Sequence, residues 1–451
     1  MKSKFAGFLK PVSILIGGAV FAHLMTALSM PVLTRLYKAE EFAVLAVLTS
    51  ATAIISAFGC LRFDVAISIP EDDEQAKSLL ILAFISSFFV FLLFVLVSLL
   101  IPLHIFSLFG LQRIGHIAWL IPLAGLAACW SSALQNWFIR NKSFSVISRN
   151  KIYQTASGIG VQLGMGFTPI RYIGLLTGYF TNLFVCFTGL MLIFLRHTKG
   201  TFRQTHFSLS GLRATWLQFS DYPKYSTFSA LCNAAAIQLP VILISSFAEK
   251  PEVGYLALAT TVMQAPMALL GAAIGQVYLS KAPGEFSAGT LREFTVEVFG
   301  GLAKTGVGPL LALGIIAPNV FGIIFGPGWE RSGQIVAILT PWYVLQFLVT
   351  PVSMSLYVTG HQRAAMYLQL SGLCLRVGSV FLPVIFSNQY FVAFYALSGI
   401  VFYLIYLLLV MRLVHIKGGQ IFHSLKRSLP IVFAWVLVAI LIVAIKVVIR
   451  V

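Results

Sequence analysis

The chain has 451 residues, of which 59% are hydrophobic and only 10% are charged, and its mean hydropathy is +0.92. A soluble protein of this length carries about a quarter charged residues and has no interior that could bury so much apolar surface. The composition therefore excludes an ordinary soluble protein and predicts an all-α polytopic membrane protein.

The chain begins with a basic tail, which is followed by a long apolar stretch ending near Met30. This stretch extends beyond the usual apolar region of a signal peptide and lacks an A-x-A cleavage site. We interpret it as a retained first transmembrane helix whose tail lies in the cytoplasm.

Further apolar segments of roughly 20 residues follow, each long enough to cross the bilayer as a helix. The alternating short segments that are typical of a membrane β-barrel do not occur. The predicted spans are 12–34, 42–61, 78–101, 115–138, 152–169, 172–195, 225–247, 253–279, 295–317, 334–358, 364–386, 390–411 and 430–449.

The basic residues are distributed unevenly between the predicted loops. With a cytoplasmic N-terminus, 21 of the 31 Lys and Arg fall in cytoplasmic segments and 8 in outer ones. This bias predicts that orientation by the positive-inside rule. The net charge of +17 then needs no nucleic-acid partner, because anionic lipid headgroups attract most of it.

One acidic run, Glu71 to Glu74, follows Pro70 at the start of the third span. Acidic residues are favourable at a helix N-terminus, so we interpret the run as a helix start, and a gate or metal site is the alternative. The longest predicted loop is 196–224, and no Walker A motif occurs. These features predict neither an enzyme nor an ATP-driven pump, and no cofactor.

The cysteines lie in or at the ends of apolar segments, and none is spaced as CxxC. We interpret them as small packing residues rather than disulfide or metal ligands. They are Cys60, Cys129, Cys186, Cys232 and Cys374.

Similar segments recur in both halves of the chain. The segment 41–46 aligns with 252–257, and the segment 108–122 aligns with 324–341. The order of these matches predicts two six-helix lobes, 1–215 and 216–415, related by a repeat of parallel topology. The remaining segment, 416–451, is predicted to be an extension with one additional transmembrane helix. Membrane transporters commonly hold their substrate between two such halves and rock to alternate its access.

Four motifs resemble the bacterial Wzx-type oligosaccharide flippases of the multidrug/oligosaccharidyl-lipid/polysaccharide exporter superfamily. They are LTRLYKAEEF (33–42), RFDVAISIPEDDEQA (62–76), AAIGQVYLSKA (272–282) and IFGPGWERSG (324–333). The resemblance covers about 10–415, although Ala43 stands where that family often has glycine.

This resemblance implies a V-shaped exporter fold in the bacterial cytoplasmic membrane. It also implies translocation of an undecaprenyl-diphosphate-linked oligosaccharide, such as an O-antigen repeat unit, from the inner to the outer leaflet, and we expect this transport to be ion-coupled with alternating access. The implied partners are this lipid-linked cargo, membrane lipids, and the glycan polymerase and glycosyltransferases of the same pathway.

Ionisable residues within spans are candidate functional residues, because each costs roughly 2.5–3.5 kcal/mol near the bilayer centre. At 100° per residue, Lys304 shares a helical face with Glu297 and Gly308, which suits a cavity wall. The alternative is a water-bridged pair between Lys304 and Glu297. Arg376 could bind a diphosphate through two parallel hydrogen bonds, or it could donate to buried backbone carbonyls.

Two arginines near the ends of spans complete the predicted substrate-binding set. Arg35 closes the first span and either compensates the diphosphate or extends to the membrane surface. Arg62 could pair with Asp64 or gate the inner mouth, and the alternative is a topology anchor. Trp329 is predicted as a residue of the interfacial aromatic belt, with sugar stacking as the alternative.

His23 and Glu297 are the predicted ion-coupling residues. A histidine titrates near neutrality and can carry a proton, although a neutral packing role for His23 is the alternative. The sequence shows no metal-binding motif.

Three other functions compete with the flippase. A drug or cation antiporter needs acidic residues in its cavity, where Glu297 is the one candidate against Lys304 and Arg376. A membrane glycan polymerase or ligase needs a sizeable outer loop. A scaffold for a glycan-assembly complex would leave the intramembrane cations without a purpose.

Overall fold

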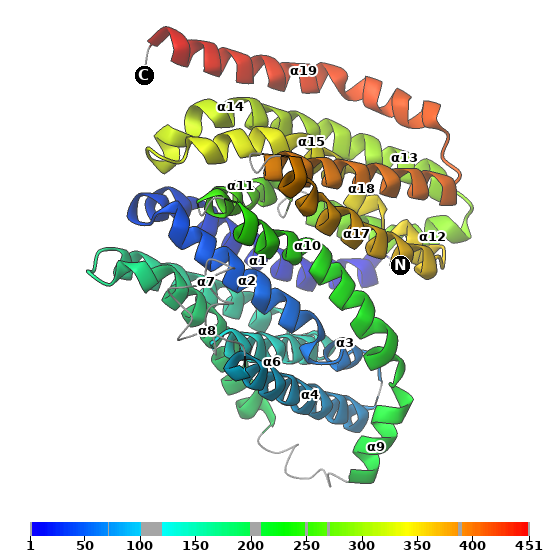
Figure 1. Ribbon diagram of the computed structural model, residues 1–451. Coiled ribbons are helices and arrows are strands. Elements are labelled where there is room, and N and C mark those ends of the chain that lie inside the picture. Colours follow the sequence, from blue (N-terminus) through cyan, green and yellow to red (C-terminus); the bar gives the residue numbers. More distant parts are fainter. Residues whose placement is uncertain are drawn as a thin grey trace. The chain divides into compact units, whose positions relative to one another are not determined.

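The computed structural model describes residues 2–70, 72–100, 120–198, 209–248, 251–267, 271–386 and 390–449 (Figure 1). In these ranges the regular elements are helices, which confirms the predicted all-α fold.

Contacts divide the chain into two compact units. Unit 1 comprises Met1–Ser29 and Leu36–Ser246, and unit 2 comprises Met30–Arg35 and Phe247–Val451. The first helix therefore contributes residues to both units, and its segment Met30–Arg35 belongs to unit 2.

The helices of unit 1 are mostly long and apolar. They are α1 (Lys2–Leu36, shared with unit 2), α2 (Ala39–Gly59), α3 (Phe63–Ala66), α4 (Asp73–Leu100), α6 (Leu120–Arg140), α7 (Phe144–Gly166), the 3₁₀-helix η2 (Arg171–Ile173), α8 (Gly174–Thr198), α9 (Leu209–Gln218), the π-helix η3 (Tyr222–Ser226) and α10 (Thr227–Phe247).

Unit 2 contains the remaining helices and a second π-helical turn. They are α11 (Glu252–Pro266), α12 (Ala272–Ser287), α13 (Leu291–Leu302), the π-helix η5 (Ala303–Val307), α14 (Gly308–Phe325), α15 (Glu330–Val352), α16 (Ser355–Val358), α17 (Gln362–Phe386), α18 (Phe391–Leu413) and α19 (Gly418–Ile449).

Ten helices within the described residues are long and apolar enough to cross a membrane, and they coincide with ten of the predicted spans. The other predicted spans, 115–138, 152–169 and 253–279, coincide with α6, α7 and the pair α11 and α12. Residues 268–270, between α11 and α12, lie outside the described part of the chain.

The predicted internal repeat stays a prediction, as do its lobes and the extension at 416–451. Most of the segment 108–122, on which part of the alignment depends, lies outside the described residues. The two aligned acidic residues, Glu41 and Glu252, each lie in the first turn of a helix, α2 and α11 respectively.

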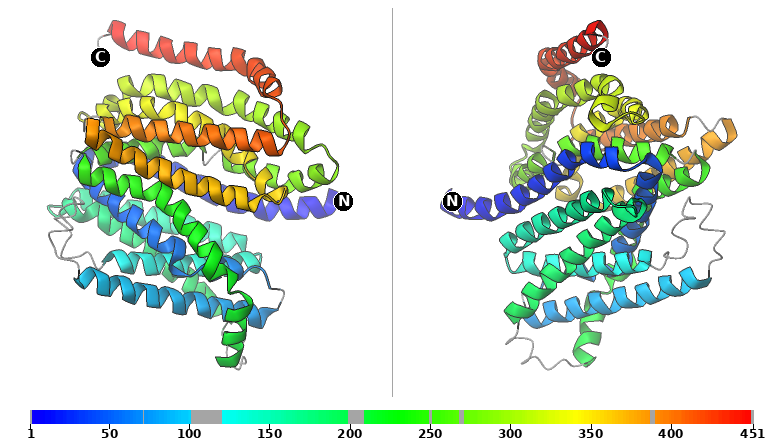
Figure 2. Two further views of the ribbon diagram at one scale, coloured as in Figure 1. Left: turned by 45° about the vertical axis from the view of Figure 1, so that its right-hand side comes forward. Right: turned by 90° about the vertical axis from the view of Figure 1, so that its left-hand side faces the viewer.

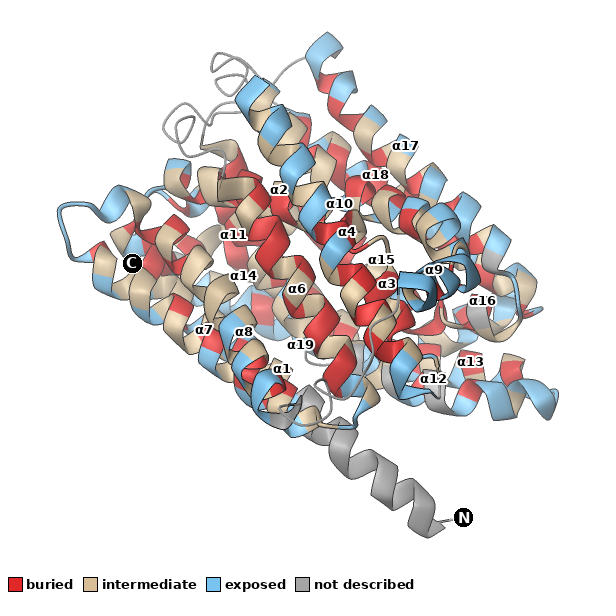
Figure 3. Ribbon diagram, turned by 90° about the horizontal axis from the view of Figure 1, so that it is seen from below, coloured by how far each residue is buried: buried red, intermediate tan, exposed pale blue. Residues whose placement is uncertain are grey.

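In unit 1, buried residues run along α6 (Figure 3). Leu134 of this helix is fully buried in a cluster that also contains Leu79 of α4. Cys60 and Cys129 lie in the same cluster as free thiols, in agreement with their predicted packing role.

Helices α7 and α8 approach each other closely at glycine positions. A Cβ atom on Gly158 would lie 3.0 Å from the carbonyl oxygen of Gly178 and 2.9 Å from Cβ of Asn182. Small residues at such crossings let backbones come together, which is how membrane helices pack without a hydrophobic driving force.

The C-terminal helix α19 lies along α13 and α14 of unit 2 (Figures 1 and 2). A Cβ atom on Gly300 would lie 2.3 Å from Oγ of Ser424, and one on Gly308 would lie 2.5 Å from Cδ1 of Trp435. Lys446 donates to the carbonyl of Asn319 in α14. These contacts dock α19 onto α13 and α14.

We expect Gly158→Leu to destabilise the protein by roughly 1–3 kcal/mol, because the side chain would overpack the α7–α8 crossing. Gly160, on the same helix, is exposed and has open space around its Cβ position, so Gly160→Leu is the matched control. Thermal unfolding in detergent checks both variants. Equal melting temperatures for the two would contradict the close crossing.

Candidate functional site

Unit 1 contains a pocket with a volume of about 180 Å³, formed by residues of α1, α6 and α7. We call it the α7 pocket, because most of its lining comes from that helix. Its lining residues are Ala19, Gln135, Ile147, Ser148, Asn150, Lys151 and Gln154.

Two of these residues have unmet interactions. Gln154 is only 5% exposed, and its side-chain oxygen Oε1 has no hydrogen-bond partner. Lys151 is half-buried and takes part in none of the three ion pairs between described residues. The lining of the α7 pocket therefore includes a glutamine whose side-chain oxygen is buried without a donor, and a lysine that has no carboxylate partner.

Amide side chains hold the pocket wall in place. Nδ2 of Asn150 donates to the carbonyl of Cys186 at 3.0 Å, and Nδ2 of Asn182 donates to the carbonyl of Gln154 at 3.0 Å. Nε2 of Gln135 lies 3.7 Å from Sγ of Cys186. These contacts tie α6 and α7 to α8, so the lining is fixed by three helices.

The predicted spans do not reveal this pocket, because the fifth predicted span begins at residue 152 and leaves Lys151 in a loop. The helix begins earlier, at Phe144. A signal was present: Lys151, Gln154 and Gly158 are spaced i, i+3 and i+7, which places them on one helical face.

His23, a predicted ion-coupling residue, lies on α1 one helical turn after Ala19 of the pocket lining. Its side chain is exposed, and it is close enough to Lys151 for their charges to interact. The structure thus brings His23 near the α7 pocket without making it part of the lining.

Arg376, a predicted substrate-binding residue, lies on α17 among aromatic rings of α15 and α18. Its guanidinium carbon is 4.8 Å from the ring centre of Phe402, 5.4 Å from that of Trp342 and 6.0 Å from that of Tyr403. We call these three rings the aromatic cluster. Arg376 is 5% exposed, so its surroundings are ring faces rather than the backbone carbonyls of the predicted alternative.

The aromatic cluster depends on two glycines. A Cβ atom on Gly399 would lie 2.2 Å from the Trp342 ring, and one on Gly372 would lie 2.6 Å from the Phe402 ring. Nε1 of Trp342 and Nε of Arg376 are buried without hydrogen-bond partners. This part of unit 2 therefore holds a buried cation and unpaired donors, with ring faces as their compensation.

Arg35 and Trp329, both in unit 2, join the end of α1 to the turn after α14. Nη2 of Arg35 donates to the carbonyl of Ile323 at 3.1 Å, and Nε1 of Trp329 donates to the carbonyl of Thr34 at 2.9 Å. The Trp329 ring is 4% exposed and meets Tyr255 edge to face. Trp329 is thus an internal packing residue, and the prediction of an interfacial belt residue was wrong.

The FGPGW turn has a backbone that favours glycine. Gly326 and Gly328 have φ values of 102° and 96°, which L-residues rarely adopt. The Glu330 carboxylate accepts from the main-chain N–H of Gly328 at 2.9 Å. Arg331 forms an ion pair with Glu252 at 2.7 Å, which links this turn to the start of α11.

Lys304 and Glu297 are exposed, but Gly308 is buried against α19, so the three do not form the predicted common face. The prediction assumed a regular α-helix. The structure has a π-helical turn at Ala303–Val307, which changes the register of the residues that follow it.

Arg62 and Asp64 flank the start of α3 and do not form an ion pair with each other. Arg62 has a left-handed backbone with φ of 61°, and its Nε has no hydrogen-bond partner. Asp64 is 5% exposed, and one of its oxygens accepts from Ser132 at 2.7 Å while the other has no partner. Neither charge is therefore neutralised by the other in this conformation.

The acidic run begins a helix, as the sequence predicts. Asp72 accepts from the main-chain N–H groups of Glu74 at 3.1 Å and Gln75 at 3.3 Å, at the N-terminus of α4. Glu71 lies outside the described residues.

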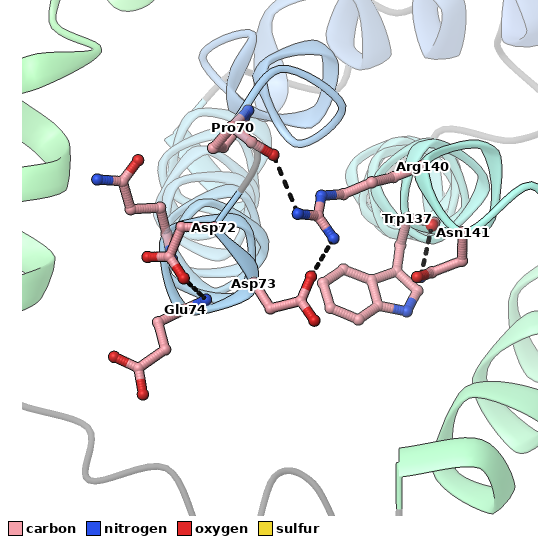
Figure 4. A network of polar contacts seen from close by, with 8 residues as sticks. Pro70, Asp72, Asp73, Glu74, Trp137, Arg140 and Asn141 are labelled. Atoms are coloured by element: carbon pink, nitrogen blue, oxygen red, sulfur yellow. Dashed lines mark hydrogen bonds and ion pairs between the residues drawn. The ribbon is translucent and has the colours of Figure 1, made fainter.

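Arg140 links α6 to this helix start (Figure 4). It forms an ion pair with Asp73 and donates to the carbonyl of Pro70 at 3.0 Å. The start of α4 is thus fixed to α6 through the Asp73 carboxylate and the Pro70 carbonyl.

Comparison with known families adds one match. The sequence model of a family described as "Polysaccharide biosynthesis protein" matches residues 32–333. This range extends from the end of α1 through the FGPGW turn. No curated protein sequence matches the chain.

Solved structures share the fold. A lipid II flippase, MurJ, in an inward closed conformation is 13% identical, with 99% of this chain and 98% of that chain covered and a TM-score of 0.69. An inward-facing multidrug resistance MATE family transporter of the MOP superfamily is 13% identical, with coverage of 90% and 96% and a TM-score of 0.65. The eukaryotic MATE transporter AtDTX14 is 15% identical, with coverage of 94% and 99% and a TM-score of 0.56. The chain thus has the exporter fold of these proteins.

We expect Arg376→Met to keep or raise the melting temperature, because it removes a buried charge that has no carboxylate partner. Trp342→Ala should destabilise by about 3–5 kcal/mol, because it empties the space of a buried ring. Thermal unfolding of the purified chain in detergent compares the two. A large loss of stability in Arg376→Met would show that the guanidinium itself holds the aromatic cluster together.

Proposed function

The chain belongs to the polysaccharide biosynthesis protein family, and we propose that it moves an undecaprenyl-diphosphate-linked oligosaccharide across the bacterial cytoplasmic membrane. Family membership, ten apolar helices in the described residues and the exporter fold support a multi-pass flippase or transporter. In this proposal the glycan passes from the inner to the outer leaflet while its lipid tail stays in the bilayer.

The charge of the α7 pocket is the observation that carries the proposal. Lys151 is the charged residue of its lining, and the other polar side chains there are amides and a serine. A site that binds cationic drugs is expected to be acidic, whereas a basic site is complementary to an anion. The pocket therefore favours a negatively charged cargo over the cargo of a drug antiporter.

Further basic residues form the proposed path of the diphosphate. None of them forms an ion pair with another described residue. Their charges therefore remain available to an anionic ligand in any state that exposes them. They are Arg35, Arg62, Lys304 and Arg376.

For coupling, we propose that His23 or Glu297 exchanges a proton or another cation as the two halves alternate access. The charge interaction between His23 and Lys151 gives a physical link. A proton on His23 places a second positive charge beside Lys151, so occupancy of the coupling residue changes the affinity of the α7 pocket for an anion.

The orientation and the partners belong to the same proposal. The N-terminus lies in the cytoplasm, as the distribution of basic residues predicts. The glycosyltransferases of the pathway supply the cargo on that side, and a glycan polymerase uses it on the other.

The test uses cells that lack this protein but keep the glycan-assembly enzymes. We expect undecaprenyl-diphosphate oligosaccharide to accumulate on the inner leaflet, as measured by lipid extraction and an external glycan-cleaving probe. The intact protein should restore delivery, and Lys151→Met should lower the delivery rate roughly tenfold or more, because it removes one partner of a charged contact. Arg149, exposed on the same helix, gives the control variant Arg149→Met.

Normal delivery in cells without the protein would contradict the flippase and favour an antiporter or a late-acting glycan enzyme. Full restoration by Lys151→Met, at equal membrane levels, would keep the flippase and remove the α7 pocket from its path.

A further inference from the structure

We infer that helix α9 lies in the surface of the bilayer, with one face inserted among anionic lipid headgroups. The inserted face is the row formed by Leu209, Arg213 and Leu217, which we call the α9 stripe. The inference concerns the bilayer and not the cargo, so it does not depend on the proposed function.

Helix α9 has three sides, because its residues fall into three groups at 100° per residue. One side packs inward, where Thr215 is 5% exposed and Phe219, directly after the helix, is 9% exposed in the core cluster of unit 1. The α9 stripe forms the second side, with the spacing i, i+4 and i+8. The third side is small and polar, and its members Gly211, Ala214 and Gln218 are all exposed.

The two leucines of the α9 stripe are strongly exposed. Leu209 is 85% exposed and Leu217 is 62% exposed, with exposed Arg213 between them. Figure 3 shows that most of the helix is exposed in the same way. Within the described residues the stripe is therefore an uncovered apolar face, and its opposite side is suited to water.

The contacts of α9 place it at a polar end of unit 1. The ring of Trp216 lies 5.1 Å from that of Phe63 in α3, and Oε1 of Gln218 lies 3.5 Å from Nε2 of Gln75. Gln75 belongs to the first turn of α4, which exposed Asp72 caps. A carboxylate is costly in hydrocarbon, so this end of α4 lies at the level of the headgroups, and α9 lies beside it.

The direction of α9 also suits the membrane surface. Figures 1 and 2 show it turned across the direction of α4 rather than running beside it. Helices that bind at the membrane surface lie in its plane, with the apolar face inserted about 5–10 Å into the boundary between headgroups and acyl chains. Trp216, at 38% exposed, adds a residue type that is enriched at this depth.

Charge determines which lipid the α9 stripe fits. The helix LSGLRATWLQ contains one basic residue, Arg213, and no acidic residue. When the leucines are inserted, the apolar stem of Arg213 can lie along the acyl chains while its guanidinium reaches the phosphates. Anionic lipids attract basic residues at this level, so the stripe is complementary to an anionic leaflet.

The test locates two labels on the full chain in lipid nanodiscs. Leu209→Cys and Ala214→Cys each carry a bimane label in a Cys374→Ser background, because the other native cysteines are buried. The two positions lie about 140° apart around the helix. We expect a doxyl quencher on the upper acyl chain to quench the label at position 209 roughly twofold more than the label at position 214, because only the stripe is inserted. Iodide in the water should give the reverse order.

Lipid composition tests the role of the charge. Adding phosphatidylglycerol to phosphatidylcholine nanodiscs should increase the acyl-chain quenching at position 209, and Arg213→Gln should remove that increase. The matched control is Arg149→Gln, which removes an exposed charge from α7 and should keep the increase.

Equal iodide quenching at both positions would place the α9 stripe in water, where a protein partner could bind it, and would overturn the inference. Weak quenching at position 209 by both reagents would show that protein covers the stripe, with the same consequence. An increase with phosphatidylglycerol that survives Arg213→Gln would refute the contact between Arg213 and anionic lipid. None of these measurements involves the cargo, so the flippase assay is judged separately.

Discussion

The hydrocarbon core of a bilayer supplies no hydrogen-bond partners, so a polar side chain on a spanning helix must find its partner within the protein, and an amide side chain here finds it on a neighbouring helix. Unit 1 depends on this constraint along α7. Asn150 and Asn182 donate across the α7–α8 crossing, which glycines such as Gly158 make close enough. The constraint is left unmet at Gln154, a lining residue of the α7 pocket whose side-chain oxygen is buried without a hydrogen-bond partner. The position of the candidate site thus follows from where the polar network is incomplete.

Unit 2 meets the same constraint with ring faces and backbone carbonyls. Arg376 has aromatic rings within 6.0 Å of its guanidinium carbon. Arg35 and Trp329 donate to carbonyls at the junction between the end of α1 and the FGPGW turn. The family match from 32 to 333 begins and ends at this junction. Two of the motifs that resemble the flippase family, LTRLYKAEEF and IFGPGWERSG, therefore lie at a structural contact in this conformation.

Composition and the lengths of the apolar segments were sufficient to predict the fold class, because burial in lipid demands long helices. Local rules also sufficed for Asp72, which caps α4. The predicted face that joined Lys304 to Gly308 failed, because no sequence rule places a π-helical turn between them. Lys151 was missed because a hydropathy window ends a span at a charge, whether or not that charge points inward. Burial of Trp329 depends on a carbonyl 295 residues away in the sequence.

The surroundings of Arg376 have a consequence for the release of an anion. When a ligand displaces a carboxylate from an arginine, that carboxylate is left without a partner. Ring faces carry no net charge, so an anion can approach and leave Arg376 without creating an unpaired acid. In the proposed function, an anion that binds Arg376 would therefore leave no unpaired acid behind, whether it arrives or departs.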